Sequence, residues 1–230
     1  MAPAAPVPIQ AVVFDLDDTL YPERDYVRSG YRAVADHLRR TLGVMQRLED
    51  FMWDLFLAGQ SAKVFDAASA HFDLHLSPAQ IAELVELYRT HAPAIAPYSG
   101  AVELLALLRV RFRLGLLSDG FLPAQRLKLN ALKIDRFFDH VLFTEDLGRD
   151  CWKPSPVGFQ TIAERLAAAP QACAYVADNP AKDFLAANRL GWRTIQYLRP
   201  SQLHAAKPAP PDGRPQRVLH TPDALLAALR

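Results

Sequence analysis

Short runs of apolar residues recur along the chain, and most of them end in a small or acidic side chain. Continuous apolar runs of this length are typical of strands buried on both faces of a parallel sheet. The stretches between them carry apolar residues every three or four positions, which predicts amphipathic helices. The predicted strands are 9–14, 113–118, 140–143, 173–177 and 194–198, and the predicted helices are 100–110, 123–132, 156–168 and 181–190. This alternation indicates an α/β fold.

The stretch 22–97 breaks the alternation, because helical patterns follow one another there without a convincing strand. These patterns cover 26–42, 49–57 and 78–88. A connection of this length with its own helices is more naturally a separate lobe than a loop. We therefore predict a core made of 1–21 and 98–230, interrupted by a helical unit at 22–97.

The two ends of the chain are expected to be less regular. The first six residues contain two prolines and are expected to form a short flexible tail. Near the other end, the proline-rich segment 200–215 is expected to loop over the surface, before a final strand and helix within 217–229.

Composition and charge narrow the classes of function. Half of the residues are apolar, 22% are charged and the formal net charge is +1, as in an ordinary globular protein. Basic and acidic residues are interspersed, so no positive stripe is available for a nucleic-acid partner. No apolar run approaches the roughly 20 residues that cross a bilayer, so no membrane partner is expected. Cys151 and Cys173 lack metal-ligand spacing, which favours reduced thiols and a cytoplasmic location.

Polar side chains follow the predicted strands at the point where each strand ends. In open parallel sheets, ligands bind at this edge. The candidates are Asp15 and Asp17 after the first strand, Ser118 and Asp119 after the second, Lys153 after the third, and Asp178 and Asp183 after the fourth. A single aspartate of this kind often only caps the next helix, but four such features in this order make a purely structural explanation improbable.

The pair Asp15 and Asp17 suits phosphoryl transfer. One carboxylate can attack phosphorus, while the other gives a proton to the leaving oxygen and later takes one from water. A magnesium ion would relieve the repulsion between them, and Asp15, the backbone carbonyl of Asp17 and Asp178 are the predicted metal ligands. Ser118 and Lys153 offer donors to the phosphoryl oxygens, and the turn at Asp119 adds backbone N–H groups.

Together these motifs resemble those of the haloacid dehalogenase-like hydrolases. They are Phe14-Asp15-Leu16-Asp17-Asp18-Thr19-Leu20, Ser118, Lys153-Pro154, and Asp178-Asn179-Pro180 with Asp183. The insert after the first motif resembles the members that carry a mobile helical cap over a Rossmann-like core. The resemblance implies Asp15 as nucleophile, Asp17 as acid/base, Ser118 and Lys153 as phosphate ligands, Asp178 as a Mg²⁺ ligand and Asp183 as its support. Asp119 and Ala177 stand where the family often has asparagine and glycine.

The predicted function is a magnesium-dependent phosphomonoester hydrolase that acts through an aspartyl-phosphate intermediate. Its expected partner is a small phosphorylated metabolite, such as a nucleotide or sugar phosphate, and the protein is expected to be a monomer or homodimer. A 2-haloacid dehalogenase is disfavoured by Asp17, because a halide leaves without a proton. A phosphomutase would keep the same residues, and a non-catalytic binding module ranks last because every catalytic position is filled. Specificity is expected from Tyr21, Arg24, Arg28 and Tyr31, in or near the insert.

Overall fold

The computed structural model describes residues 7–45 and 47–229, so the predicted N-terminal tail at 1–6 lies outside the described residues. The chain divides into two compact units. The first, the α/β unit, comprises 1–24 and 96–230, and the second, the helical unit, comprises 25–95. Within the described ranges, no helix combines the length and the apolar character that crossing a membrane requires.

A six-stranded parallel sheet forms the centre of the α/β unit, with the strand order β3-β2-β1-β4-β5-β6. The strands are β1 (Ala11–Phe14), β2 (Arg113–Ser118), β3 (His140–Phe143), β4 (Cys173–Ala177), β5 (Arg193–Tyr197) and β6 (Arg217–Leu219). β1 pairs with β2 on one side and β4 on the other, and all four of its residues are buried. This confirms the predicted α/β fold with a Rossmann-like parallel sheet.

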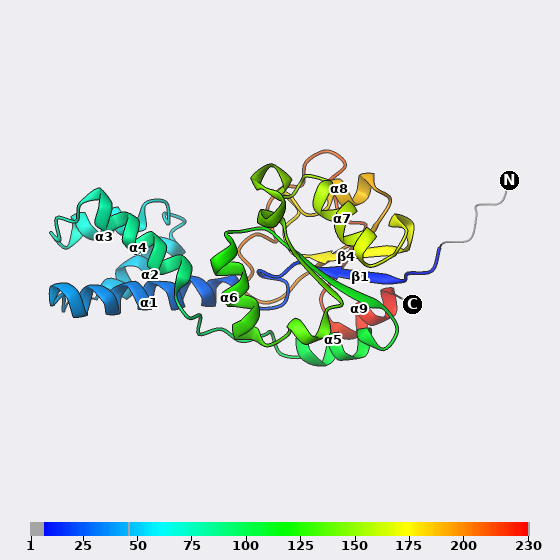
Figure 1. Ribbon diagram of the computed structural model, residues 1–230, viewed down its shortest axis with the longest axis horizontal. Helices are drawn as coiled ribbons and strands as arrows, with labels where there is room; N and C mark the ends of the chain where they lie inside the picture. The colour runs from blue at the N-terminus through cyan, green and yellow to red at the C-terminus, as the bar shows by residue number, and fades with distance from the viewer. Residues whose placement is uncertain (1–6, 46, 230) are drawn as a thin grey trace. The chain divides into compact units, whose positions relative to one another are not determined.

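Helices cover both faces of this sheet. They are α5 (Ala101–Arg109), α6 (Leu122–Leu132), α7 (Val157–Arg165), α8 (Leu185–Arg189) and α9 (Pro222–Ala228), with 3-10 turns η1 (Asp135–Phe137), η2 (Thr144–Leu147), η3 (Arg149–Cys151) and η4 (Pro170–Ala172). Figure 1 shows α7 and α8 on one face, and α5 and α9 on the other. Under α7, the ring of Phe159 meets those of Tyr175 and Trp192 edge-on, at centroid distances of 4.9 and 5.6 Å. The strands are thereby enclosed on both faces, which explains their continuous apolar runs.

One helix of this unit begins later than the sequence predicts. The prediction places a helix at 181–190, whereas α8 begins at Leu185. The residues before it form a turn that is closed by side-chain acceptors: Asp183 Oδ2 accepts from the Asn179 N–H at 3.0 Å, and Asn179 Oδ1 accepts from the Ala181 N–H at 3.1 Å. Side-chain bonds of this kind compete with helix formation.

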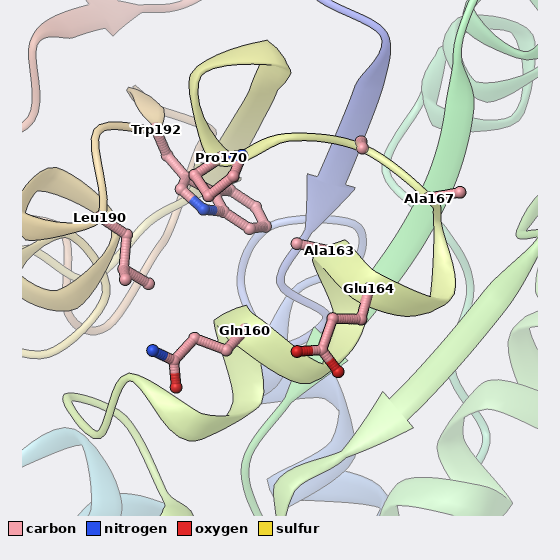
Figure 2. A pocket seen from close by; sticks show the side chains of 8 residues that line it. Gln160, Ala163, Glu164, Ala167, Pro170, Leu190 and Trp192 are labelled. Atoms are coloured by element: carbon pink, nitrogen blue, oxygen red, sulfur yellow. The ribbon is translucent and has the colours of Figure 1, made fainter.

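A cavity of about 300 Å³ lies beside α7 (Figure 2). Its lining residues are Gln160, Ala163, Glu164, Ala167, Ala168, Pro170, Leu190 and Trp192. None of the predicted site residues is among them. This cavity is therefore separate from the site that the sequence predicts.

The helical unit contains α1 (Glu23–Leu42), α2 (Leu48–Leu57), α3 (Val64–His71) and α4 (Pro78–Thr90), and α1 begins in the last residues of the first α/β segment. Their apolar faces enclose a common core, in which the ring of Tyr31 lies 5.8 Å from Tyr88 and 6.3 Å from Phe65. Tyr31 is only 3% exposed, so this candidate for specificity is a packing residue.

The sequence prediction missed α3. Lys63 precedes this helix with a φ of 54° and offers no capping side chain, so the usual start signal is absent. By contrast, α4 begins with a capping box, in which Ser77 and Gln80 bond each other's backbone N–H groups, followed by proline at the first position. The helix with a readable start was predicted, and the one without it was not.

Candidate active site

The carboxyl ends of neighbouring strands gather the predicted residues in the α/β unit. Asp15 follows β1 and its backbone N–H donates to the Val176 carbonyl of β4 at 3.0 Å. Ser118 ends β2, on the other side of β1. Six of the seven candidates are less than 10% exposed, namely Asp15, Ser118, Asp119, Lys153, Asp178 and Asp183. Asp17 is the one that is only half-buried.

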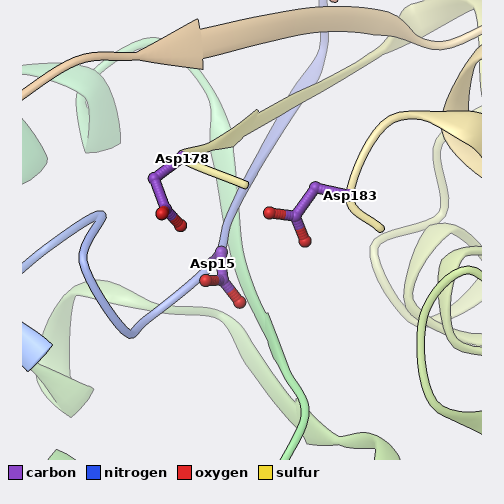
Figure 3. A group of neighbouring side chains, drawn as sticks. All are labelled: Asp15, Asp178 and Asp183. Atoms are coloured by element: carbon purple, nitrogen blue, oxygen red, sulfur yellow. The ribbon is translucent and has the colours of Figure 1, made fainter. Parts of the chain in front are cut away.

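Three carboxylates face one another in this group (Figure 3). Asp15, Asp178 and Asp183 each offer an oxygen, and these atoms lie within 4.8 Å of one another. Burial, with help from Asp183, raises the pKa of Asp178 to about 9. Burial also raises the pKa of Asp15 to about 7, although Lys153 opposes this change. Three buried carboxylates are thus held together at a cost that a proton or a cation would relieve.

The group fits a hard divalent cation. Asp178 Oδ2 is buried and has no hydrogen-bond partner among the described residues. Buried carboxylate oxygens are usually paired or bind a metal, and carboxylates are the ligands that Mg²⁺ prefers. The carboxylate of Asp17 is not part of the trio, and its predicted metal contact through the backbone carbonyl stays a prediction.

Lys153 supplies the positive charge next to the trio. Its Nζ donates to Asp15 Oδ1 at 2.6 Å and to the Tyr175 hydroxyl at 2.8 Å, and it forms an ion pair with Asp183 Oδ1 at 2.8 Å. Burial alone would lower the pKa of Lys153, but Asp15 and Asp183 outweigh it and keep the pKa well above its usual value. The ammonium is therefore charged and orients one oxygen of Asp15.

Asp17 is held by three side chains outside the trio. Its Oδ1 accepts from Lys128 Nζ at 2.7 Å and from the Tyr21 hydroxyl, and its Oδ2 accepts from Gln125 Nε2 at 2.8 Å. Burial would raise the pKa of Asp17, but Lys128 and the hydrogen bonds outweigh burial and lower it. These contacts stabilise the ionised carboxylate, which is the form that remains after an acid has given up its proton.

The loop around Asp17 is also tied to the C-terminal part of the chain. Asp18 has a φ of 55°, and its carboxylate accepts from the backbone N–H groups of Glu23 at 2.8 Å and Leu203 at 2.6 Å. Gln202 Nε2 donates to the Asp18 carbonyl at 2.7 Å. The proline-rich segment 200–215 therefore does more than loop over the surface, since it braces the loop that carries Asp17.

Ser118 and Asp119 have different surroundings. Ser118 Oγ accepts from Gln125 Nε2 at 3.1 Å, so its own hydrogen is available to a substrate oxygen. Asp119 Oδ1 accepts from Thr144 Oγ1 at 2.8 Å and from the Lys153 N–H at 3.1 Å, and Oδ2 accepts from Lys182 Nζ at 3.0 Å. Asp119 thus faces protein donors, and its direct contact with a phosphate stays a prediction.

The sequence reasoning missed several residues of this site. They are Gln125, Lys128, Thr144, Tyr175 and Lys182, each of which bonds one of the predicted residues. Gln125 and Lys128 are buried polar residues three positions apart in α6, a spacing that places them on one face of the helix. Two polar residues on an otherwise apolar helical face are the signal that could have identified Gln125 and Lys128.

Comparisons with known proteins agree with these observations. The family model of the haloacid dehalogenase-like hydrolases matches residues 9–191. The glyceraldehyde 3-phosphate phosphatase of Methanopyrus kandleri is 31% identical over 96% of this chain and 97% of the relative. The pyrophosphatase PpaX of Bacillus pumilus is 26% identical over 81% of this chain and 82% of the relative.

Solved structures show the same fold. The HAD-hydrolase YfnB from Bacillus subtilis, bound to magnesium, has a TM-score of 0.67 at 19% identity, covering 97% of this chain and 100% of that one. A HAD family hydrolase from Deinococcus radiodurans, with bound phosphate and sodium, has a TM-score of 0.65 at 23% identity, covering 96% and 95%. The matched family model and the relative in Methanopyrus kandleri decide the assignment. This chain belongs to the haloacid dehalogenase-like hydrolases.

Proposed function

We propose that this chain is a magnesium-dependent phosphomonoester hydrolase that acts through an aspartyl phosphate on Asp15. The observation that carries the proposal is the separation of two kinds of carboxylate at one sheet edge. Asp15 lies in the trio with Asp178 and Asp183, whereas Asp17 is held outside it by Lys128. One group is suited to metal binding and attack, and the other to proton transfer.

The first half of the reaction forms the intermediate. An oxygen of Asp15 attacks phosphorus, and the bond from phosphorus to the leaving oxygen breaks. Asp17, in its protonated form, donates its proton to that leaving oxygen. Lys128 stabilises the carboxylate that results, through the contact at 2.7 Å. Mg²⁺ held by Asp15 and Asp178 would neutralise charge that develops on the phosphoryl oxygens.

The second half returns the enzyme to its starting state. Asp17, now a base, takes a proton from water, and the water oxygen attacks phosphorus. The bond between phosphorus and the Asp15 oxygen breaks, which releases inorganic phosphate and regenerates the carboxylate. Lys153, in its buried contact at 2.6 Å, compensates the charge of the Asp15 carboxylate before the attack and again when the carboxylate is regenerated.

The comparisons favour hydrolysis of a phosphorylated metabolite over the alternatives. Two of the relatives are named as phosphatases. The one from Methanopyrus kandleri is named for glyceraldehyde 3-phosphate, and the one from Bacillus pumilus is named as a pyrophosphatase. A dehalogenase would not need the proton that Asp17 is placed to give. We propose a small phosphorylated metabolite as the substrate class, and a cytoplasmic location and a monomeric or dimeric state stay predictions.

The test is phosphate release from an aryl phosphate after the metal has been stripped with a chelator. Magnesium should restore turnover, whereas calcium should bind and restore little. Calcium accepts more ligands and can take both oxygens of one carboxylate, which would occupy the attacking oxygen of Asp15. A quenched reaction should show a phosphoryl group on the peptide that contains Asp15. Full activity without metal, or equal turnover with calcium, would contradict the proposal.

A screen of phosphorylated metabolites then addresses the substrate. Sugar phosphates, nucleotides and pyrophosphate should be compared at one magnesium concentration by released phosphate. Transfer of the phosphoryl group within a sugar bisphosphate, without release, would instead favour a phosphomutase.

A further inference from the structure

Three lysines contact carboxylates of the site, and they differ in how far their ammonium groups are used. The Lys128 side chain is 8% exposed and is paired with Asp17. The Lys153 side chain is 1% exposed and is surrounded by three acceptors. To bind a phosphate oxygen, Lys153 would have to weaken one of these contacts. The third lysine, Lys182, is the one with donors to spare.

Lys182 has one partner among the residues that the structure describes. Its Nζ donates to Asp119 Oδ2 at 3.0 Å, and its side chain is 35% exposed. An ammonium group carries three N–H donors, so two remain for another acceptor. The exposed fraction also shows that part of this side chain meets solvent.

Asp119 fixes where this ammonium lies. The Asp119 side chain is only 3% exposed, and its other oxygen is held by Thr144 and by the backbone N–H of Lys153. Asp119 is also the neighbour of Ser118, whose hydroxyl hydrogen is free to donate. The contact therefore holds the Lys182 ammonium against the residue that follows Ser118.

Lys182 lies next to the carboxylates of the site. It directly precedes Asp183 in the chain, and the Asp183 carboxylate belongs to the trio with Asp15 and Asp178. A dianionic phosphoryl group that enters among these carboxylates needs positive charge close by.

We propose that Lys182 is a further substrate-binding residue, whose ammonium donates to a non-bridging oxygen of the phosphoryl group while Asp119 positions it. This inference rests on the proposed phosphatase function and deepens it. It also gives Asp119 a role, since its carboxylate holds the lysine in place of a direct contact with the substrate.

The test is binding of inorganic phosphate, measured by calorimetry with magnesium present. Lys182→Met should raise the dissociation constant about 10- to 100-fold, because a charge-assisted hydrogen bond is lost. Lys182→Arg, which keeps the charge, should stay within a few-fold of the wild type. Lys133→Met is the matched control, since Lys133 is exposed and directly follows the last residue of α6, and it should leave binding unchanged.

A purely structural role for Lys182 gives a different pattern. If Lys182 only neutralised Asp119, the double variant Asp119→Asn/Lys182→Met would recover both thermal stability and phosphate affinity. Our inference expects recovered stability with affinity still weak. Recovered affinity in the double variant, or unchanged affinity in Lys182→Met, would overturn it. The double variant also carries the test if Lys182→Met alone does not fold.

The outcome can be separated from that of the proposed function. A wild type that binds phosphate through Lys182 but hydrolyses no phosphomonoester would refute the phosphatase and leave Lys182 as an anion-binding residue. An active wild type whose phosphate affinity does not depend on Lys182 would refute only the inference about Lys182.

Discussion

The α/β unit and the helical unit differ in whether they bury charged side chains. The described charged residues that are buried all belong to the α/β unit, namely Asp15, Asp18, Asp119, Lys128, Lys153, Asp178 and Asp183. The buried polar side chains described in the helical unit are Ser29, Ser69 and His91. Ion pairs of the helical unit, such as Arg47 with Asp50, lie at the surface.

This difference separates what stabilises the protein from what makes it reactive. Exposed ion pairs contribute only about 0–1 kcal/mol each, so the helical unit depends on its apolar core. Burying charges has a desolvation cost that their pairing offsets only in part. The sheet edge nevertheless holds several carboxylates in buried positions. This indicates that they are kept for their chemistry and not for stability.

The largest expected effect follows from removing one charge at the sheet edge. Asp15→Asn should lower turnover on the order of 10⁴-fold or more, because an amide oxygen does not replace the attacking carboxylate. The fold should be retained, as judged by circular dichroism. Asp54→Asn, on an exposed position of α2, is the matched control and should leave turnover unchanged. Near-normal turnover in Asp15→Asn would remove the covalent mechanism.

The next effect concerns the apolar core of the helical unit. Met52 is fully buried there, and Met52→Ala should reduce the free energy of unfolding of this unit by about 2–5 kcal/mol. Hydrogen exchange of the amides in α1 to α4, recorded over a series of urea concentrations, would measure this free energy. Leu57→Ala, at a side chain that is 59% exposed, should cost less than about 0.5 kcal/mol. A cost as small for Met52 would show that the apolar core is not what stabilises the helical unit.

A smaller effect is expected from the hydroxyl that supports Lys153. Tyr175→Phe should lower turnover about 10-fold, since the charge-assisted hydrogen bond from Lys153 Nζ to the hydroxyl is lost while Asp15 and Asp183 still hold the ammonium. Tyr197→Phe is the control, because this buried strand tyrosine bonds Arg199 and no site residue. Equal losses in both variants would point to a general effect on the sheet.

The smallest effect has the opposite sign. Without metal, Asp178→Asn should raise the free energy of unfolding by about 1 kcal/mol near pH 8. The pKa of Asp178 is raised to about 9 from an ordinary value of 3.8, so between these values the folded protein holds a proton that the unfolded chain releases. The stability that the Asp178 carboxyl contributes to the wild type is therefore fully present below about pH 4, and it is lost as the pH rises toward 9.

Thermal unfolding at several pH values would show this as a gain that grows from pH 5 to pH 8.5. Magnesium should reverse the order of the two proteins, because it stabilises the wild type through Asp178. A variant that is less stable at every pH would mean that Asp178 is not strained in the metal-free protein.

The positions of the main strands along the chain, and the residues at which they end, could be predicted because their signals are local. The run ending at Ser118 and the run ending at Ala177 are apolar, uninterrupted and bounded by polar residues, and β2 and β4 end at these positions. The grouping of Asp15 with Asp178 was predictable for the same reason, since adjacent parallel strands end at one edge.

The remaining contacts depend on tertiary packing, which a local pattern does not contain. Lys128 contacts Asp17 across 111 positions of sequence, and α6 reads as an ordinary amphipathic helix. Tyr175 looks like one more apolar strand residue until its hydroxyl is seen against Lys153. Lys182 reads as a surface lysine, and only the fold shows that it reaches back to Asp119.

The central position of β1 in the sheet has a consequence during synthesis on the ribosome. Asp15 emerges early, but Lys153 follows it by 138 residues, and β4 is made later still. At about 5–20 residues per second, the nascent chain carries an unpaired Asp15 for roughly 7 to 30 s. Neither the carboxylate trio nor the Lys153 contact can form in that interval, and a chain released before Asp183 lacks one member of the trio.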